Sequence, residues 1–371
     1  MSEPLEPWLE RQYRHAATAL LRSVSATHIV KQRPGFGTTV RAAAGSIVAS
    51  PVLGAYDPDP DYFFHWYRDS AVVLEALRLL YNDGTLGAEA LAHFGDFLRF
   101  NLALRGLDGR ALGADRSWRG RVQPDFTRFL RDDAELAQVH GEAVAAETRV
   151  NPDGTLDISK WARPQHDGPP LRALAVLGWL RNVPLDVTAE HDAATLLCAD
   201  LNFSLRHWRE PSYDIWEEER GRHYYTWRVS AAALAAGADW FEVKGESGLV
   251  HSLREEAATI LRELDGYWLA DAGYYRSRVL ESGAHSAKEL DIAVILSAIH
   301  SSSGSAAAGG AHSPHDPRMH ATLHSLEHLF DRAYAINHQR AAGTAPAMGR
   351  YAGDVYYSGG AYYFSTLGAA E

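Results

Sequence analysis

Three adjacent carboxylates follow a tryptophan directly in the segment Ser212–Glu219, which reads Ser-Tyr-Asp-Ile-Trp-Glu-Glu-Glu. A carboxyl group beside an indole loses solvation, which disfavours its charged form and suits it to donate a proton. A tryptophan also offers a flat apolar face on which a sugar ring can stack. Protonation of a glycosidic oxygen by such an acid is half of the chemistry that cleaves glycosides. Taken alone, the segment is explained better as a solvated charge run at a helix start, and the other segments change that balance.

A second aromatic segment, Tyr62–Ser70, carries an adjacent arginine and aspartate ahead of a helical pattern. Arg68 and Asp69 offer donors and acceptors that together can grip neighbouring sugar hydroxyls, while the aromatic side chains shape a pocket. The alternative is that Asp69 or Ser70 caps the N-terminus of the helix. A cap would not require so many aromatic residues, so we favour the binding role.

Two further segments repeat this combination of aromatic residue, arginine and aspartate. One is Trp161–Arg172, whose prolines fit the first turn of a helix. The other is Gly349–Gly360, whose glycines indicate tight backbone turns. Four such segments are typical of loops that hold a functional site on a rigid frame.

The apolar pattern of the chain predicts that this frame is helical nearly everywhere. Strand-like alternation is short and confined to residues 38–52. Several helical segments, such as Ala231–Ala236, are apolar around much of their circumference, which suits helices packed on two sides in a double-layered ring. We therefore expect an all-α packing of helical hairpins. Apolar residues recur near every 3.6 positions over residues 8–21, 71–81, 88–107, 171–180, 193–208, 229–241, 253–264, 290–299 and 321–335.

The bulk properties limit the class of protein. The chain has 371 residues, 46% of them hydrophobic, and we expect a single domain over residues 1–371 because no linker is evident. The formal net charge is −11 without a basic block, which argues against binding to nucleic acid or to an anionic membrane. The lone Cys198 cannot form an intrachain disulfide, no apolar run approaches the roughly 20 residues that span a bilayer, and the N-terminus lacks a secretion-signal pattern. We therefore expect a cytoplasmic protein, whose oligomeric state the sequence does not predict.

Three other patterns have structural rather than chemical explanations. His320, His324 and His328 recur every four residues, but no glutamate separates the first two as in a zinc-binding His-Glu-Xaa-Xaa-His motif, so we expect a solvated or mixed helix face. The segment Asp57–Asp61 resembles a calcium loop but lacks its glycine and closing glutamate, so we expect a rigid turn. Residues 108–150 are highly charged and weakly periodic, and we expect an elaborated loop or an added hairpin.

The four aromatic segments, in this order and at these intervals, resemble the glucoamylase family of inverting α-glucosidases, glycoside hydrolase family 15. The shared motifs are Trp-Xaa-Arg-Asp-Ser, Trp-Xaa-Arg-Pro-Gln-Xaa-Asp-Gly-Pro, Tyr-Asp-Xaa-Trp-Glu-Glu and Gly-Arg-Tyr…Asp…Tyr-Tyr. The resemblance extends from about Tyr62 to the last residue. It implies an α/α toroid of six helical hairpins and a glycoside hydrolase that releases glucose from non-reducing ends of α-glucans or oligosaccharides with inversion. It implies no metal and no other cofactor.

The resemblance also implies roles for individual residues. Glu217 matches the general acid, and Tyr62 matches a tyrosine near the attacking water. The residues that match sugar contacts are Trp66, Arg68, Asp69, Trp161, Arg163, Asp167, Trp216, Glu218, Arg350 and Asp354. No general base is identified, because the family's glutamate lies downstream of the Gly-Arg-Tyr segment and Glu371 arrives too early to match it. We accordingly expect the toroid in this chain to lack its last helices.

Three alternatives remain open. A preference for α-1,6 linkages, as in isomaltose, is possible because linkage choice depends on the next sugar position, which residues 108–150 and 218–228 can shape. A catalytically inactive sugar-binding protein is the second alternative, because the general base is not matched. A purely structural helical scaffold is the least favoured, because it gives no reason for four loops with the same composition.

Overall fold

The structure is a computed structural model that describes residues 4–54, 61–246, 248–302, 310–341, 343–356 and 359–371. The chain divides into two compact units. Unit 1 comprises Met1–Trp161 and Gly178–Ala199, and unit 2 comprises Ala162–Leu177 and Asp200–Glu371. The expected single domain over residues 1–371 stays a prediction.

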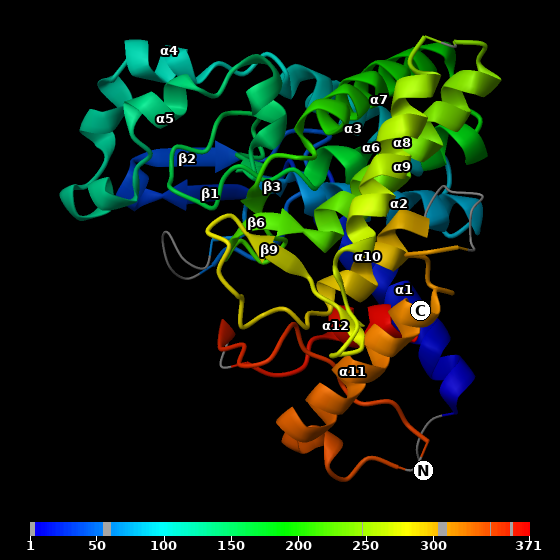
Figure 1. Cartoon of the computed structure of the whole chain (residues 1–371). Coiled ribbons are helices and arrows are strands. Elements are labelled where there is room, and N and C mark those ends of the chain that lie inside the picture. The colour runs from blue at the N-terminus through cyan, green and yellow to red at the C-terminus, as the bar shows by residue number, and fades with distance from the viewer. Residues whose placement is uncertain (1–3, 55–60, 247, 303–309, 342, 357–358) are drawn as a thin grey trace. The chain divides into compact units, whose positions relative to one another are not determined.

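Each of the nine segments with a helical apolar pattern forms an α-helix (Figure 1). Three of these helices lie in unit 1: α1 (Leu5–Leu21), α2 (Tyr67–Asn82) and α3 (Ala88–Leu104). Two contain residues of both units: α6 (Gly168–Asn182) and α7 (Val187–His207). Four lie in unit 2: α8 (Tyr224–Val243), α9 (Val250–Asp265), α10 (Ala293–Ser302) and α11 (Pro317–Ala333). None of the helices among the described residues combines the length and apolar character needed to cross a bilayer.

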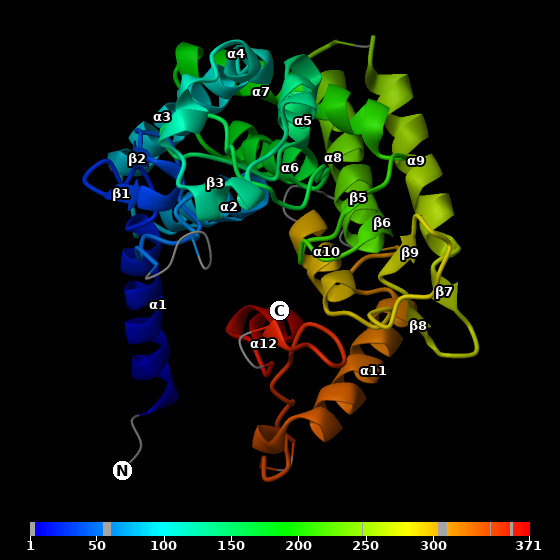
Figure 2. The same cartoon turned by 90° about the vertical axis from the view of Figure 1, so that its left-hand side faces the viewer.

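The core of unit 2 includes α8, which is buried along most of its length, as its run of small apolar residues predicts. Gly237 of α8 lies so close to Leu201 of α7 that a Cβ atom at this glycine would be 2.4 Å from the leucine Cδ1 atom. The neighbouring α9 packs against α8 (Figure 2), and its buried residues recur at helical spacing on one side. Small residues in α8 thus allow the close helix packing that fixes the loops at the helix ends.

Residues 108–150 form a chain of short helices in unit 1. These elements are α4 (Gly109–Ala114), η2 (Ser117–Arg121), η3 (Pro124–Phe129), α5 (Asp133–Ala137) and η4 (Gly141–Ala146). Side-chain caps start two of them, because Asp108 accepts the N–H of Arg110 and Asp132 accepts the N–H of Glu135. Trp118 and Leu136 contribute to a small apolar cluster that also includes Phe36. Helices this short leave little periodic signal, which explains the expectation of an elaborated loop.

The strands of unit 1 are short. β1 (Val30–Arg33) and β2 (Thr38–Arg41) pair antiparallel, and β3 (His65–Trp66) pairs with β4 (Arg149–Val150). The strand-like pattern over residues 38–52 overestimated the strand, which ends at Arg41. Gly45, with a φ of +83°, turns the chain shortly after that residue.

Unit 2 contains two small sheets. β5 (Ser212–Tyr213), β6 (Arg220–His223) and β9 (Arg278–Leu280) form a three-stranded sheet in this order, and β7 (Trp268–Leu269) pairs with β8 (Tyr274–Tyr275). The sequence did not predict these strands, because two to four residues are too few to show alternation. The last elements are η5 (Ala335–Asn337) and α12 (Tyr363–Ala370).

Candidate active site

Glu217 lies on a tight turn between β5 and β6 in unit 2. Its backbone has a φ of +65°, a left-handed conformation that side-chain-bearing residues rarely adopt. The N–H of Glu217 donates to the carbonyl oxygen of Asp214 at 2.9 Å. The Asp214 carboxylate in turn accepts the N–H of Glu218 at 2.8 Å. A strained residue costs about 1–3 kcal/mol and persists only where the surroundings determine it, so the Asp214 contacts hold Glu217 in this conformation.

Behind this turn, the buried Arg278 of β9 binds three carboxylates. Its guanidinium donates to Asp214 at 2.5 Å and to Glu219 at 2.9 Å, and also to Asp291. Burial opposes the charge of Arg278, but the surrounding carboxylates outweigh it and raise the pKa of this arginine. Three carboxylates on one guanidinium leave an excess of negative charge behind the turn.

Asp291 connects the turn to the Gly349–Gly360 segment. The completely buried carboxylate accepts the indole N–H of Trp216 and the N–H of Ala293, each at 2.8 Å. A backbone bridge pairs Asp291 with Tyr351. Burial raises the pKa of Asp291 to about 6, although Arg278 and the donated hydrogen bonds oppose this shift. The indole of Trp216 is therefore held by a buried acid that changes its charge near pH 6.

Glu218 is held by donors from two other segments. Its Oε1 accepts from Arg350 at 3.2 Å, and its Oε2 accepts from the Tyr351 hydroxyl and from Lys288, each at 2.6 Å. Arg350 donates two further hydrogen bonds, of 2.6 and 2.5 Å, to Asp354. Burial opposes the charge of Asp354, but the bonds from Arg350 outweigh it and lower the pKa of this carboxyl. Glu218, Arg350 and Asp354, which the sequence predicted as sugar contacts, thus form one ionic network.

The segment with Arg163 and Asp167 reaches the same turn within unit 2. The N–H of Tyr213 donates to the carbonyl oxygen of Pro164 at 2.9 Å, and the Gln165 side chain donates to the carbonyl oxygen of Asp214 at 3.4 Å. Asp167 is buried immediately before α6. The structure therefore brings the Arg163–Asp167 segment to β5 and to the start of the turn that carries Trp216 and Glu217.

The predicted aromatic contacts of unit 1 form one cluster. The ring centroids of Tyr62 and Trp66 are 6.0 Å apart, and those of Trp66 and Trp161 are 6.1 Å apart. The guanidinium carbon of Arg149 lies 3.6 Å from the centroid of Trp161 and 4.7 Å from that of Trp66. Asp157 holds this arginine through a bond of 2.9 Å. The sequence did not predict the role of Arg149, which lies in the weakly periodic region.

Arg68 and Asp69 lie in the first turn of α2, where they form an ion pair of 3.7 Å. The alternative that Asp69 or Ser70 caps this helix is wrong. The helix begins at Tyr67, its N-cap is Trp66, and this N-cap residue makes no side-chain capping hydrogen bond. Pairing of β3 with β4 fixes the start of the helix instead. The side chains of Arg68 and Asp69 are 16% and 40% exposed, so both reach the surface, as a binding role requires.

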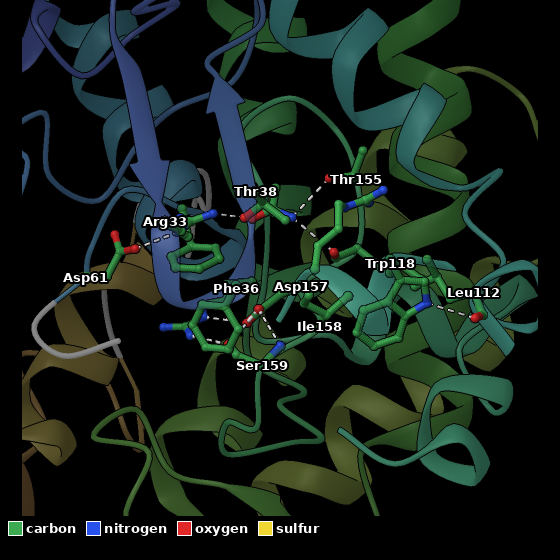
Figure 3. A pocket seen from close by; sticks show the side chains of 15 residues that line it. Arg33, Phe36, Thr38, Asp61, Leu112, Trp118, Thr155, Asp157, Ile158 and Ser159 are labelled. Carbon is green, nitrogen blue, oxygen red and sulfur yellow. Dashed lines mark hydrogen bonds and ion pairs between the residues drawn. The ribbon is translucent and has the colours of Figure 1, made fainter. Parts of the chain in front are cut away.

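A cavity of about 210 Å³ in unit 1 lies beside the β1–β2 hairpin (Figure 3). Buried ion pairs form part of its wall, with Arg33 bound to Asp61 at 2.6 Å and Arg149 bound to Asp157 at 2.9 Å. None of the residues predicted to bind the sugar lines this cavity. A second cavity, of about 480 Å³ in unit 2, includes Asp354 in its lining and thus borders the ionic network described above.

The remaining sequence patterns concern possible metal ligands. Among the described residues, no group of three or more His, Cys, Asp or Glu side chains is arranged to hold a metal ion. His320, His324 and His328 are exposed on α11, as expected for a solvated face. The Nε2 atoms of His324 and His328 are 2.8 Å apart, and His320 contacts the Pro314 carbonyl oxygen. Residues 57–60 of the calcium-like segment lie outside the described residues.

Comparison with known proteins finds one family. The sequence model described as "Glycosyl hydrolases family 15" matches residues 19–96 and 145–371. A glucoamylase of Neurospora crassa is 29% identical over 335 residues, which are 89% of this chain and 47% of the relative. Glucoamylase 1 of Rhizopus oryzae is 24% identical over 376 residues, which are 99% of this chain and 54% of the relative. The chain therefore spans about half the length of the curated relatives it matches.

Solved structures show the same likeness. A family 15 glucoamylase from Hypocrea jecorina is 25% identical with a TM-score of 0.75, over 99% of this chain and 55% of that structure. A glucoamylase from Saccharomycopsis fibuligera is 21% identical with a TM-score of 0.74, over 99% of this chain and 72% of that structure. These glucoamylases are α/α toroids, so the expected all-α, α/α-toroid fold class is confirmed.

Proposed function

The chain belongs to glycosyl hydrolases family 15, and from this premise we propose that it is a glucoamylase-like, exo-acting α-glucoside hydrolase. It releases glucose from the non-reducing ends of α-glucans or oligosaccharides with inversion. The observation that carries this proposal is the turn of unit 2, where Glu217 has a φ of +65° and follows a tryptophan whose indole is fixed by Asp291. A network of this kind, which holds an acid beside an aromatic face, suits the protonation of a glycosidic oxygen.

In the proposed reaction, Glu217 gives its proton to the glycosidic oxygen while the bond between this oxygen and the anomeric carbon breaks. The leaving sugar departs with the proton as a hydroxyl group. Water attacks the anomeric carbon from the opposite face, which inverts its configuration. The water gives one of its two protons to a base and keeps the other in the new hydroxyl group. Tyr62 would lie near this water, as the resemblance implies. We assign no residue of this chain as the base.

Each unit, taken by itself, carries residues with the chemistry of sugar contacts. In unit 1, the Arg68–Asp69 pair offers donors and acceptors to hydroxyl groups, and Trp66 and Trp161 offer aromatic faces. In unit 2, the proposed contacts are Arg163, Asp167, Trp216, Glu218, Arg350 and Asp354. Arg350 supports this role because its guanidinium, fixed by Asp354, lies 5.2 Å from the centroid of the Trp216 ring.

The test is glucose release from maltose, isomaltose and panose by the wild type and by Glu217→Gln. The substitution keeps the shape of the side chain but removes its proton, and we expect a loss of about 10²–10⁴-fold in rate. Glu246→Gln, at an exposed position of unit 2, is the matched control and should retain full activity. Undiminished activity of Glu217→Gln would remove this residue from the mechanism.

The same assay separates the alternatives. The ratio of the rates on maltose and isomaltose measures the preference between α-1,4 and α-1,6 linkages. Calorimetric binding of maltose without any turnover by the wild type would favour a sugar-binding protein over a hydrolase. The cytoplasmic location expected from the sequence stays a prediction, which fractionation of the native host cells would test.

A further inference from the structure

Lys288 contacts the candidate active site from a loop that no motif predicted. This loop joins β9 to α10, and its backbone is fixed on both sides of the lysine. The N–H of Lys288 donates to Ser286 Oγ at 3.0 Å, and its carbonyl oxygen accepts from Ser277 Oγ at 2.8 Å. Ser286 also donates to Glu219 at 2.7 Å, which ties the loop to the turn that carries Glu217. The position of the lysine is therefore set by the same turn that positions the acid.

The Lys288 ammonium occupies one of the three contacts on Glu218. A carboxylate has about four lone-pair sites, and donors from Lys288, Arg350 and Tyr351 fill three of them. Arg350 cannot move easily, because Asp354 binds it and its side chain is only 7% exposed. Lys288 has a flexible stem and a side chain that is 23% exposed. Of the two cations on Glu218, Lys288 is thus the one that can shift when a ligand arrives.

The ammonium group of Lys288 also has donors to offer. It carries three N–H bonds, of which one points to Glu218 at 2.6 Å. The same nitrogen lies 4.8 Å from the centroid of the Tyr351 ring, which stabilises its charge without using a hydrogen bond. The partly exposed ammonium can therefore bind an oxygen atom of a ligand while it still contacts Glu218.

Charge indicates which part of the substrate this lysine contacts. Under the proposed function, Glu217 reaches the glycosidic oxygen, so the neighbouring Glu218 and its lysine lie close to the bond that breaks. Positive charge develops on the ring of the terminal glucose in the transition state. An ammonium beside that ring would be repelled, whereas beside the leaving sugar it meets neutral hydroxyl groups and an oxygen that gains electron density.

We propose that Lys288 is a specificity-determining residue that donates a hydrogen bond to a hydroxyl group of the leaving sugar. Lys288 and this sugar would both contact Glu218. This inference rests on the proposed function and adds to it a contact for the second sugar unit. Substrates without a leaving sugar do not need the contact. Disaccharides and longer oligosaccharides have a leaving sugar and therefore need the contact with Lys288.

The test compares two substrates in Lys288→Met, Lys288→Gln and Lys288→Arg. For maltose, we expect Lys288→Met to lower kcat/KM about tenfold, the size of one charge-assisted hydrogen bond in a partly exposed place. For α-glucosyl fluoride, which has no leaving sugar, kcat/KM should stay within about twofold of the wild type. Lys288→Arg should retain most of the activity on maltose, and Lys288→Gln should be intermediate. Lys160→Met is the matched control, because the ammonium group of the exposed Lys160 donates to the Arg128 carbonyl oxygen in unit 1.

Several outcomes of the comparison between the two substrates would overturn the role of Lys288. Equal losses on maltose and α-glucosyl fluoride, or no loss on either, would overturn the role of Lys288 and leave the proposed function intact. A wild type that hydrolyses neither substrate but binds maltose would remove the proposed reaction only. In that case, a maltose affinity that falls in Lys288→Met supports the contact, and an unchanged affinity overturns it. A wild type without activity or maltose binding overturns both proposals.

Discussion

Asp291→Asn should change the pH dependence of stability in a direction that the buried network fixes. The wild-type carboxyl is completely buried with a pKa of about 6, compared with an ordinary value of 3.8. A raised pKa means that the folded state binds the proton more tightly than the unfolded state. The stability associated with the neutral carboxyl is therefore fully present below pH 3.8 and is lost as the pH rises through 6. Asparagine stays neutral throughout this range.

The magnitude follows from the size of the shift. A difference of about 2 pKa units corresponds to about 3 kcal/mol of unfolding free energy. We therefore expect Asp291→Asn to gain about 3 kcal/mol relative to the wild type between pH 4 and pH 7. The difference in unfolding free energy between the variant and the wild type at any single pH is a separate quantity. The substitution also removes a partner of Arg278, and breaking a buried pair can cost about 3–5 kcal/mol. Arg278 keeps two other carboxylates, which limits that cost.

The assay is urea unfolding of both proteins at pH 4, 5, 6 and 7, analysed as the difference between the two at each pH. Groups remote from Asp291 that titrate in this range contribute equally to both proteins and cancel. Asp125→Asn, at an exposed position, is the control and should run parallel to the wild type. A difference between Asp291→Asn and the wild type that stays constant from pH 4 to pH 7 would refute the assignment of a raised pKa to Asp291.

Three further predictions concern the same unit. Arg278→Met leaves the carboxylates that this arginine binds without their shared cation, and it should lower the unfolding free energy at pH 7 by at least about 3 kcal/mol, measured by urea unfolding. Gly237→Ala places a methyl group against a neighbouring leucine at 2.4 Å, and it should cost about 1–3 kcal/mol; an unchanged melting temperature would contradict the close helix packing. Trp216→Phe removes the indole N–H that binds Asp291, and it should reduce glucose release about tenfold, the size of one hydrogen bond to a charged group. Activity equal to that of the wild type would show that this bond does not position the acid.

Local patterns predicted the helices and marked the segment that carries Trp216, Glu217 and Glu218. The periodic apolar residues of α8 and α9 specify which faces are buried, and these faces are buried in the structure. The motif with Trp216, Glu217 and Glu218 likewise forms one turn, which the neighbouring Asp214 holds in place through its carbonyl oxygen and its carboxylate. Features of this kind depend on residues that are close in the sequence, and a sequence displays them directly.

The contacts that assemble the turn could not be predicted, because they join distant residues. Glu218 and Tyr351, for instance, are 133 positions apart, and Glu218 and Lys288 are 70 positions apart. A lysine in a loop and an arginine in a strand of three residues show no pattern that distinguishes them from surface residues. The start of α2 was misjudged for a similar reason, since the pairing of two short strands determines it rather than a capping side chain.

The most direct measurement of the central claim compares hydrolysis of maltose and α-glucosyl fluoride by Glu217→Gln. A sugar needs a proton to leave, whereas fluoride is a good leaving group that depends far less on a donor. If Glu217 is the proton donor, the variant loses about 10²-fold or more of its rate on maltose and keeps most of its rate on the fluoride. Equal losses on both substrates, or full activity on maltose, would contradict the claim that this carboxyl group protonates the leaving sugar.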